Sequence, residues 1–126
     1  MNVQALSYWQ KAKQALEDAK TLLPESPDGS ASRSFYAGFL AVSALFALTG
    51  KRFRKHTELE AAVHRELIKT GRWPRELGTG YTYLLKTRAT ADYGDAVNVT
   101  EEEATQALNY AEAIVGKVGE SFPLDV

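Results

Sequence analysis

Two short stretches of this chain hold the side chains best suited to binding an anion. Arg33 and Tyr36 are three residues apart, and Arg88 precedes Asp92 by four residues. Residues three or four apart lie on the same face of a helix. The planar guanidinium group of arginine can donate two parallel hydrogen bonds to a phosphate. Both arginines are therefore candidates for binding a phosphate group.

Each stretch also has a structural interpretation. Arg33 borders the most apolar segment and could lie at the end of a helical bundle with its charge in solvent. Alternatively, it could bind an anion near a helix N-terminus. Arg88 and Asp92 could form an intrahelical ion pair, or an inward-facing pair that holds the helix end against its neighbours. The sequence leaves these alternatives open.

Histidine is the side chain best suited to moving protons near neutral pH. His56 follows four cations within residues 51–55 and could flank a helix or act as an acid or base. For His64 we expect only a packing or surface role. Arg88, Asp92 and His56 are thus catalytic candidates, none of them established, and the sequence does not decide whether the chain is an enzyme.

Several kinds of chemistry have no support in the residues. The chain has no cysteine and only two histidines, which excludes a thiolate site and disfavours a histidine-rich zinc site. The phosphate-binding glycine loop, the nucleophile elbow and the paired-histidine metalloprotease motif are absent. We therefore expect no metal and no cofactor.

Charge is distributed unevenly along the 126 residues, although the formal net charge is only -1. Residues 51–88 contain ten basic and four acidic side chains, whereas residues 89–126 contain one basic and eight acidic side chains. The basic segment could face a nucleotide, an RNA or an acidic partner. Alternatively, the two segments could pack together and neutralise each other.

Apolar residues recur every three or four positions along most of the chain, which predicts helices. We expect a first helix before residue 24 and a second helix after a break at 25–32. Three more helices are expected from Thr57 to Gly71, from Pro74 to about residue 90, and from Thr100 to about residue 118. Thr57 with Glu60, and Thr100 with Glu103, have the spacing of capping boxes. Trp73 could anchor the corner before Pro74 or be exposed to a partner.

These helices predict an all-α fold, an antiparallel up-down four-helix bundle with room for a short extra helix. One domain would span residues 1–120, followed by a flexible tail at 121–126. The longest uncharged stretch, residues 34–50, is predicted to be a buried core helix rather than a membrane span. With no targeting signal visible, we expect a cytoplasmic protein that does not enter a membrane.

Three motifs resemble those of the HEPN domain family. The stretch S-R-S-F-Y-A-G-F at 32–39 is similar to the S-R-x-Y-Y-A-x-F opening of the family's second helix. The K-H pair at 55–56 resembles the K-x-H or K-H element before its third helix, and R-A-T-A-D-Y at 88–93 resembles the R-x-x-A-D-Y element of a small stand-alone subgroup. The order of helices also agrees, over about residues 5–118.

The resemblance implies a helical bundle that dimerises and pairs with a minimal nucleotidyltransferase in toxin–antitoxin-like modules. Many family members are ribonucleases, in which a histidine follows an arginine by four to six residues. Here the corresponding positions after Arg88 hold Asp92, Tyr93, Gly94 and Asp95. Aspartate is a base rather than an acid near neutral pH. The resemblance therefore transfers Arg88 and Tyr93 to this chain, but not the histidine.

The leading hypothesis is a module without the usual catalytic histidine, which binds a nucleotide, an RNA or a nucleotidyltransferase. Its binding residues would be Arg33, Tyr36, Arg88 and Tyr93. The alternative is a divergent, metal-independent HEPN ribonuclease toxin in which Asp92 or His56 moves protons. A third interpretation is an interaction domain without a ligand. We also expect a homodimer, because aromatic residues are enriched at interfaces and several here exceed what one small core can hide: Tyr8, Trp9, Tyr81 and Tyr83.

Overall fold

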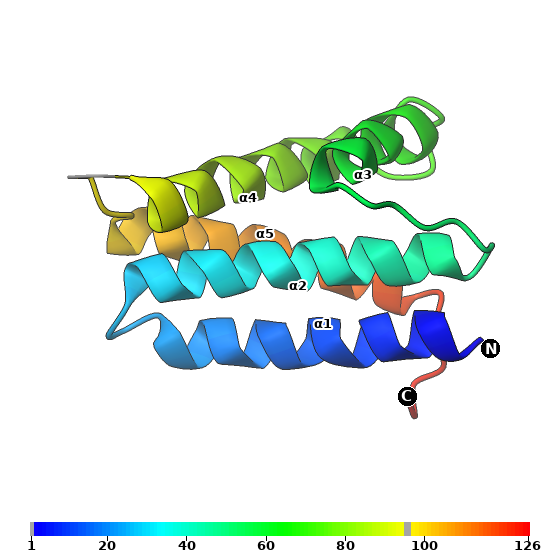
Figure 1. The fold of residues 1–126 in the computed structure, drawn as a ribbon, viewed down its shortest axis with the longest axis horizontal. Coiled ribbons are helices and arrows are strands. Elements are labelled where there is room, and N and C mark those ends of the chain that lie inside the picture. The colour runs from blue at the N-terminus through cyan, green and yellow to red at the C-terminus, as the bar shows by residue number, and fades with distance from the viewer. Residues whose placement is uncertain (1, 95–96) are drawn as a thin grey trace.

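A computed structural model describes residues 2–94 and 97–126. In these residues five α-helices and one π-helical turn follow one another along the chain. Each of the four long helices runs antiparallel to the next long helix along the chain, and a short helix with its π turn lies over one end (Figure 1). The predicted all-α bundle with a short extra helix is confirmed. The elements are α1 (Val3–Leu22), α2 (Pro27–Ala47), α3 (His56–Ala62), η1 (Val63–Ile68), α4 (Arg75–Tyr93) and α5 (Glu101–Gly119).

Helix α2 lies at the centre of the bundle and contacts α1, α4 and α5. Its sequence is apolar on most sides, which suits a helix with neighbours all around it. Small side chains let these neighbours approach closely. At Gly38, an added Cβ atom would lie 2.9 Å from Leu84 of α4. The uncharged segment 34–50 is therefore largely a core helix, as expected.

The predicted break at 25–32 is too long, since α2 already begins at Pro27. Ser26 caps this helix by accepting a hydrogen bond from the backbone N–H of Gly29, at 3.0 Å. Proline is favoured in the first turn because that position needs no N–H donor. Pro27 thus opens a helix instead of ending one. Arg33 consequently lies in the second turn of α2, and not at the helix N-terminus where we expected it.

Only one of the two predicted capping boxes forms. The side chain of Thr100 accepts from the N–H of Glu103 at 3.1 Å, and Glu103 accepts from the N–H of Thr100 at 3.0 Å. The box predicted at Thr57 is wrong, because α3 begins at His56 with Lys55 as an N-cap that makes no side-chain bond. Helix α3 therefore starts with the imidazole ring at its first position.

The corner between η1 and α4 is anchored by Trp73, which is 5% exposed and whose backbone N–H donates to the carbonyl of Leu67. Burial excludes the alternative that this ring faces a partner. The aromatic residues offered as an argument for dimerisation are also buried or packed against the core: Tyr8, Trp9, Tyr81 and Tyr83. Trp9 and Tyr81 are fully accounted for by this core, whereas Tyr8 and Tyr83 are only partly buried.

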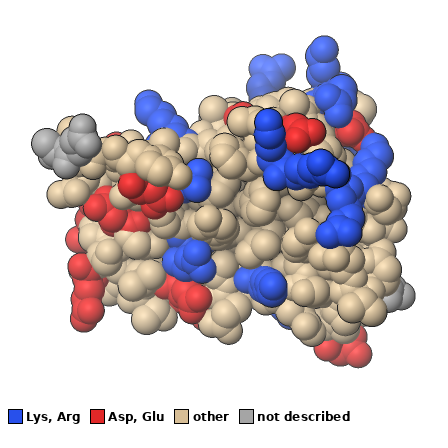
Figure 2. Space-filling model, viewed as in Figure 1, with Lys and Arg blue, Asp and Glu red and all other residues tan. Residues whose placement is uncertain are grey.

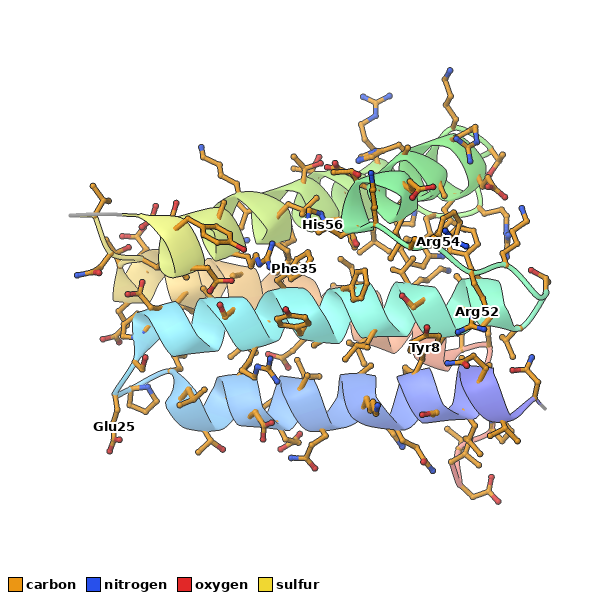
Figure 3. The ribbon with its side chains drawn as sticks, viewed as in Figure 1. Tyr8, Glu25, Phe35, Arg52, Arg54 and His56 are labelled. Atoms are coloured by element: carbon orange, nitrogen blue, oxygen red, sulfur yellow. The ribbon has the colours of Figure 1, made fainter. Side chains whose placement is uncertain are left out.

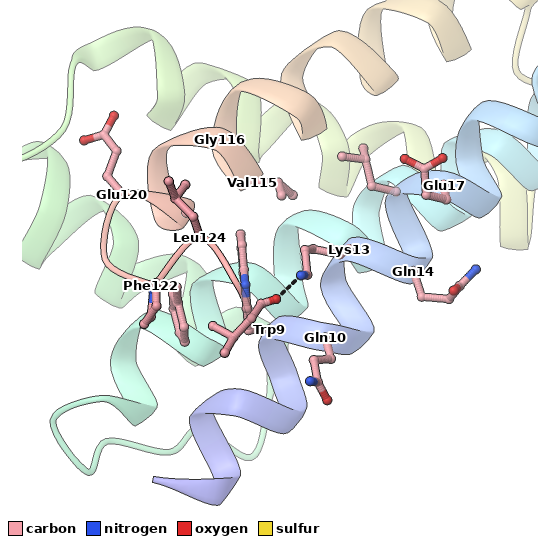
Figure 4. A pocket seen from close by; sticks show the side chains of 14 residues that line it. Trp9, Gln10, Lys13, Gln14, Glu17, Val115, Gly116, Glu120, Phe122 and Leu124 are labelled. Atoms are coloured by element: carbon pink, nitrogen blue, oxygen red, sulfur yellow. Dashed lines mark hydrogen bonds between the residues drawn. The ribbon is translucent and has the colours of Figure 1, made fainter. Parts of the chain in front are cut away.

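The segment predicted as a tail lies against the bundle. Phe122 is buried and stacks on Trp9, with ring centroids 4.9 Å apart and planes 11° apart. Lys13 donates a hydrogen bond to the carbonyl of Val126 (Figure 4). Between α1, the end of α5 and this segment lies a cavity of about 870 Å³.

Basic and acidic side chains remain largely apart in the fold. Most cations visible in Figure 2 gather over α3 and the segment before it. Among the ion pairs of the described residues, only Arg88–Asp92 joins the basic segment to the acidic one. Lys51 and Arg65 instead both contact Glu66, and the Lys51 hydrogen bond lowers the pKa of that carboxyl. The two segments thus do not neutralise each other through ion pairs.

No helix in residues 2–94 and 97–126 is both long and apolar enough to cross a membrane.

Candidate functional site

A pocket of about 510 Å³ lies between α2, α4 and the segment that leads into α3. Figure 3 shows Phe35 and His56 in the space between α2 and α4. Aromatic rings from α2 form one part of its wall, and cationic or donor side chains form the rest. The lining residues are Phe35, Tyr36, Phe39, Arg54, Lys55, His56, Thr57 and Arg88.

The ring of Phe35 brings Arg88 and His56 into one pocket. Phe35 is 2% exposed, so its position is set by packing in the core. The guanidinium carbon of Arg88 lies 5.3 Å from the ring centroid. The imidazole of His56 meets the same ring edge-on, with centroids 6.1 Å apart and planes at 86°. Residues 32 positions apart in the sequence therefore line the same pocket.

Arg88 is held in place by its neighbours. Its Nε–H donates to Oδ2 of Asp92 at 2.9 Å, and only 15% of its side chain is exposed. The guanidinium group also lies 5.4 Å from the ring centroid of Tyr93. The two terminal nitrogens make no hydrogen bond within the described residues, so they are available to an anion in the pocket.

Asp92 connects two helices. One carboxylate oxygen accepts from Arg88, and the other accepts from the hydroxyl of Ser32 on α2. Both oxygens thus have protein donors, and the carboxylate is positioned to orient Arg88. This geometry favours the inward-facing pair over a solvent-exposed intrahelical pair. Asp95, another acidic residue after Arg88, lies outside the described residues.

Arg33 and Tyr36 form a second pair beside the pocket. The guanidinium carbon of Arg33 lies 4.7 Å from the ring centroid of Tyr36. Tyr36 in turn contacts the rings of Phe35 and Phe39 edge-on. Tyr36 lines the pocket, whereas Arg33 reaches it only through this ring, and Tyr93 reaches it only through Arg88. Of the four predicted binding residues, two therefore line the pocket.

Sequence reasoning missed part of the pocket wall. Arg54, Lys55 and Phe35 line it but are not among the binding residues that the sequence predicts. The run of cations directly before His56 was the available signal. The Nδ1 atom of His56 is buried and has no hydrogen-bond partner among the described residues.

The pocket favours anions over cations. Three cationic side chains line it, and no carboxylate does. A cluster of such charges without an opposing carboxylate attracts phosphate. Among residues 2–94 and 97–126, no three histidine, aspartate or glutamate side chains are grouped so that they could hold a metal ion.

Fold and pocket together define a small helical bundle with an arginine-containing anion pocket between its second and fourth helices. The HEPN domain family matches residues 5–121 of the chain, which includes every residue of this pocket. The chain belongs to the HEPN domain family.

Two relatives and one solved structure are similar to this chain. The chain is 37% identical over 115 residues to a Thermotoga maritima protein named UPF0332 protein, covering 90% of this chain and 87% of the relative. It is 29% identical over 109 residues to a Methanocaldococcus jannaschii protein whose name provisionally calls it a toxin, covering 86% of this chain and 74% of the relative. The crystal structure of TT1696 from Thermus thermophilus has the same fold, with a TM-score of 0.81 at 23% identity over 97% of this chain and all of the other.

Proposed function

We propose that this protein is a HEPN module that binds the phosphates of RNA or of a nucleotide in its Arg88 pocket, within a toxin-like cytoplasmic system. The observation that carries the proposal is the composition of the pocket wall. Arg88, Arg54 and Lys55 face it together with three aromatic rings, and no carboxylate lines it. Cations bind phosphates and aromatic rings stack on bases, a combination typical of single-strand binding sites.

Partner proteins are part of the proposal. A homodimer would place a second copy beside the pocket, where Tyr93 is 70% exposed and stacks against Arg88. The resemblance further suggests a minimal nucleotidyltransferase as a partner. Sedimentation of the purified chain at micromolar concentration tests the dimer, and a monomer there contradicts it. Co-purification with a nucleotidyltransferase encoded beside this protein tests the second partner.

A second candidate function is RNA cleavage by the same pocket. The specific observation in its favour is that His56 and Arg88 both lie against the ring of Phe35 and line one pocket. His56 would take the proton of a ribose 2′-hydroxyl, whose oxygen attacks the adjacent phosphorus while the bond to the 5′-oxygen breaks and that oxygen takes a proton from water. Arg88 would stabilise the charge on the phosphoryl oxygens. Asp92 fits this chemistry poorly, since both of its oxygens already accept hydrogen bonds.

Binding is tested by fluorescence anisotropy with a labelled single-stranded RNA of about ten nucleotides at two salt concentrations. Arg88→Ala should weaken binding by about tenfold, the effect of losing a charge-assisted contact, and should reduce the salt dependence. Lys11→Ala is the matched control, because it removes an exposed cation of α1 that lines no pocket described here. Equal effects of the two substitutions would refute the proposed pocket.

Cleavage is tested separately by incubating the same RNA with the protein and separating the products. Under the second candidate function, wild-type protein cuts the RNA, while His56→Gln binds it without cutting. If the wild-type protein leaves the RNA intact, whether it is a dimer or a monomer, the result refutes the ribonuclease function and agrees with the binding function.

A further inference from the structure

A second pocket lies between η1 and the first half of α4. It has a volume of about 290 Å³ and shares no residue with the Arg88 pocket. Its wall contains one cation, one imidazole, two hydroxyls and a single larger apolar side chain. The lining residues are His64, Ile68, Arg75, Gly78, Thr79 and Thr82.

Two unfavourable local features converge on His64. It belongs to a π-helical turn, in which the N–H of Lys69 bonds to the carbonyl of His64 five residues earlier, at 2.9 Å. Such turns are rare and often occur at functional sites. The turn packs against Gly78, a buried glycine inside α4, where glycine is destabilising relative to alanine.

The absence of a side chain at Gly78 makes room for the imidazole ring. A Cβ atom there would lie 3.2 Å from Cε1 of His64 and 3.0 Å from Cγ1 of Ile68. Both contacts would be tighter than ordinary packing allows, so alanine would push the ring away from α4. A π-helical turn and a glycine inside a helix are both locally unfavourable, and such features are expected at functional sites.

The ring of His64 is oriented by a hydrogen bond between its Nε2 atom and the hydroxyl of Thr82, at 3.3 Å. If Nε2 accepts this bond, the N–H at Nδ1 remains available to a ligand. If Nε2 donates, the hydroxyl hydrogen of Thr82 remains available instead. In either tautomer the pair keeps one donor free, beside the hydroxyl of Thr79 and the guanidinium group of Arg75.

We propose that this pocket is a second anion site, which binds a single phosphate group through His64, Arg75, Thr79 and Thr82. Every polar side chain in its wall can donate a hydrogen bond, and no carboxylate lines it. Its volume is below that of most pockets for whole small molecules, about 300–1,000 Å³. The ligand is therefore a phosphate group, either free or at the end of a nucleotide or RNA.

The two histidines of the chain allow both pockets to be observed in one experiment. In a proton NMR titration at constant ionic strength, the Cε1 proton of His64 reports on this pocket and that of His56 reports on the Arg88 pocket. The signals are assigned with His64→Gln and His56→Gln. Inorganic phosphate should shift the His64 signal with saturation at millimolar concentration, and this outcome does not depend on the proposed RNA-binding function.

Single substitutions distinguish specific phosphate binding in this pocket from general attraction of phosphate to a basic surface. Arg75→Ala and Thr82→Val should each raise the Kd for phosphate at His64 by about fivefold or more. Lys69→Ala is the matched control, since it removes an exposed cation outside the pocket and should change the Kd less than twofold. Equal effects of Lys69→Ala and Arg75→Ala, or no saturable shift, would overturn the proposal.

The source of the phosphate group is identified by repeating the titration with adenosine monophosphate and with a short uridine oligonucleotide. Stronger shifts at His64 with either ligand than with inorganic phosphate would assign the pocket to that ligand. Tightest binding of inorganic phosphate would assign it to the free ion. All three results agree with a phosphate site, whereas shifts confined to His56 would contradict it.

Discussion

Replacing Asp92 with alanine should destabilise the fold more than loss of an ordinary surface ion pair. The substitution removes the hydrogen bonds from Arg88 and from Ser32, and with them a connection between α4 and α2. An exposed intrahelical pair contributes about 0.2–0.5 kcal/mol. Here the side chains of Arg88 and Asp92 are only 15% and 29% exposed. Hydrogen bonds to a charged group in such surroundings contribute about 2 kcal/mol.

One effect opposes this loss. Asp92 lies in the last turn of α4, where the helix dipole disfavours a negative charge by about 0.5 kcal/mol. The net loss is therefore about 1.5 kcal/mol. An unfolding entropy of roughly 2.1 cal/mol/K per residue corresponds to about 0.26 kcal/mol/K for this chain. Asp92→Ala should consequently lower the Tm by about 6 °C.

The assay is thermal unfolding followed by circular dichroism, with Glu17→Ala as the matched control. Glu17 also pairs with a cation on its own helix, Lys20, but these side chains are 67% and 43% exposed. The control should lose about 2 °C or less. A double-mutant cycle with Arg88→Ala should give a coupling energy of about 1 kcal/mol. If Asp92→Ala costs no more than Glu17→Ala, or the cycle shows no coupling, then Asp92 does not hold Arg88 in place.

Four further predictions concern packing and burial. Gly80→Ala should destabilise the protein by about 1–3 kcal/mol in urea unfolding, because the added Cβ would lie 2.5 Å from the ring of Tyr110. Gly116→Ala should stabilise α5 by up to about 1 kcal/mol, because an added Cβ there would have nothing within 4 Å. Stability changes of the same sign for both variants would contradict this packing. Tyr81→Phe should leave stability unchanged or raise it in the same assay, because the buried hydroxyl has no partner among the described residues, and a loss above about 1 kcal/mol would reveal one. Burial, with a smaller contribution from a nearby carboxylate, raises the pKa of Tyr81. Ionisation of this phenol in the unfolded chain should therefore leave stability unchanged below about pH 10 and lower it at higher pH. Phenolate absorbance from Tyr81 that appears before unfolding would disprove this. Phe122→Ala should destabilise by about 3 kcal/mol in thermal unfolding, because the ring is buried in a stack on α1, and a shift below about 1 kcal/mol would show that the last residues are not docked.

Much of the fold is predictable from local sequence because its determinants are local. Periodic apolar residues specify the helices, and the Thr100–Glu103 spacing specifies the cap that forms. The prediction of a helix boundary fails where the same residue type is compatible with two different positions at a helix start. Pro27 was read as a helix breaker but opens α2, because proline is excluded only from helix interiors. Thr57 has the spacing of a cap, yet the helix begins one residue earlier.

The candidate site is less predictable, since its residues come from three elements. Sequence alone identified Arg88, Tyr36 and His56 as separate candidates. Their common pocket depends on Phe35, whose buried ring contacts both Arg88 and His56.

What the sequence by itself determined is therefore the set of helices, the family and the individual polar groups, because these follow from residue type and short spacing. Tertiary structure alone decided which of these groups meet. Packing of α3 against α2 places a histidine in the same pocket as an arginine far along the chain, and a missing side chain at Gly78 lets a second imidazole reach α4. Such contacts depend on the shapes of buried surfaces, which no spacing within one helix encodes.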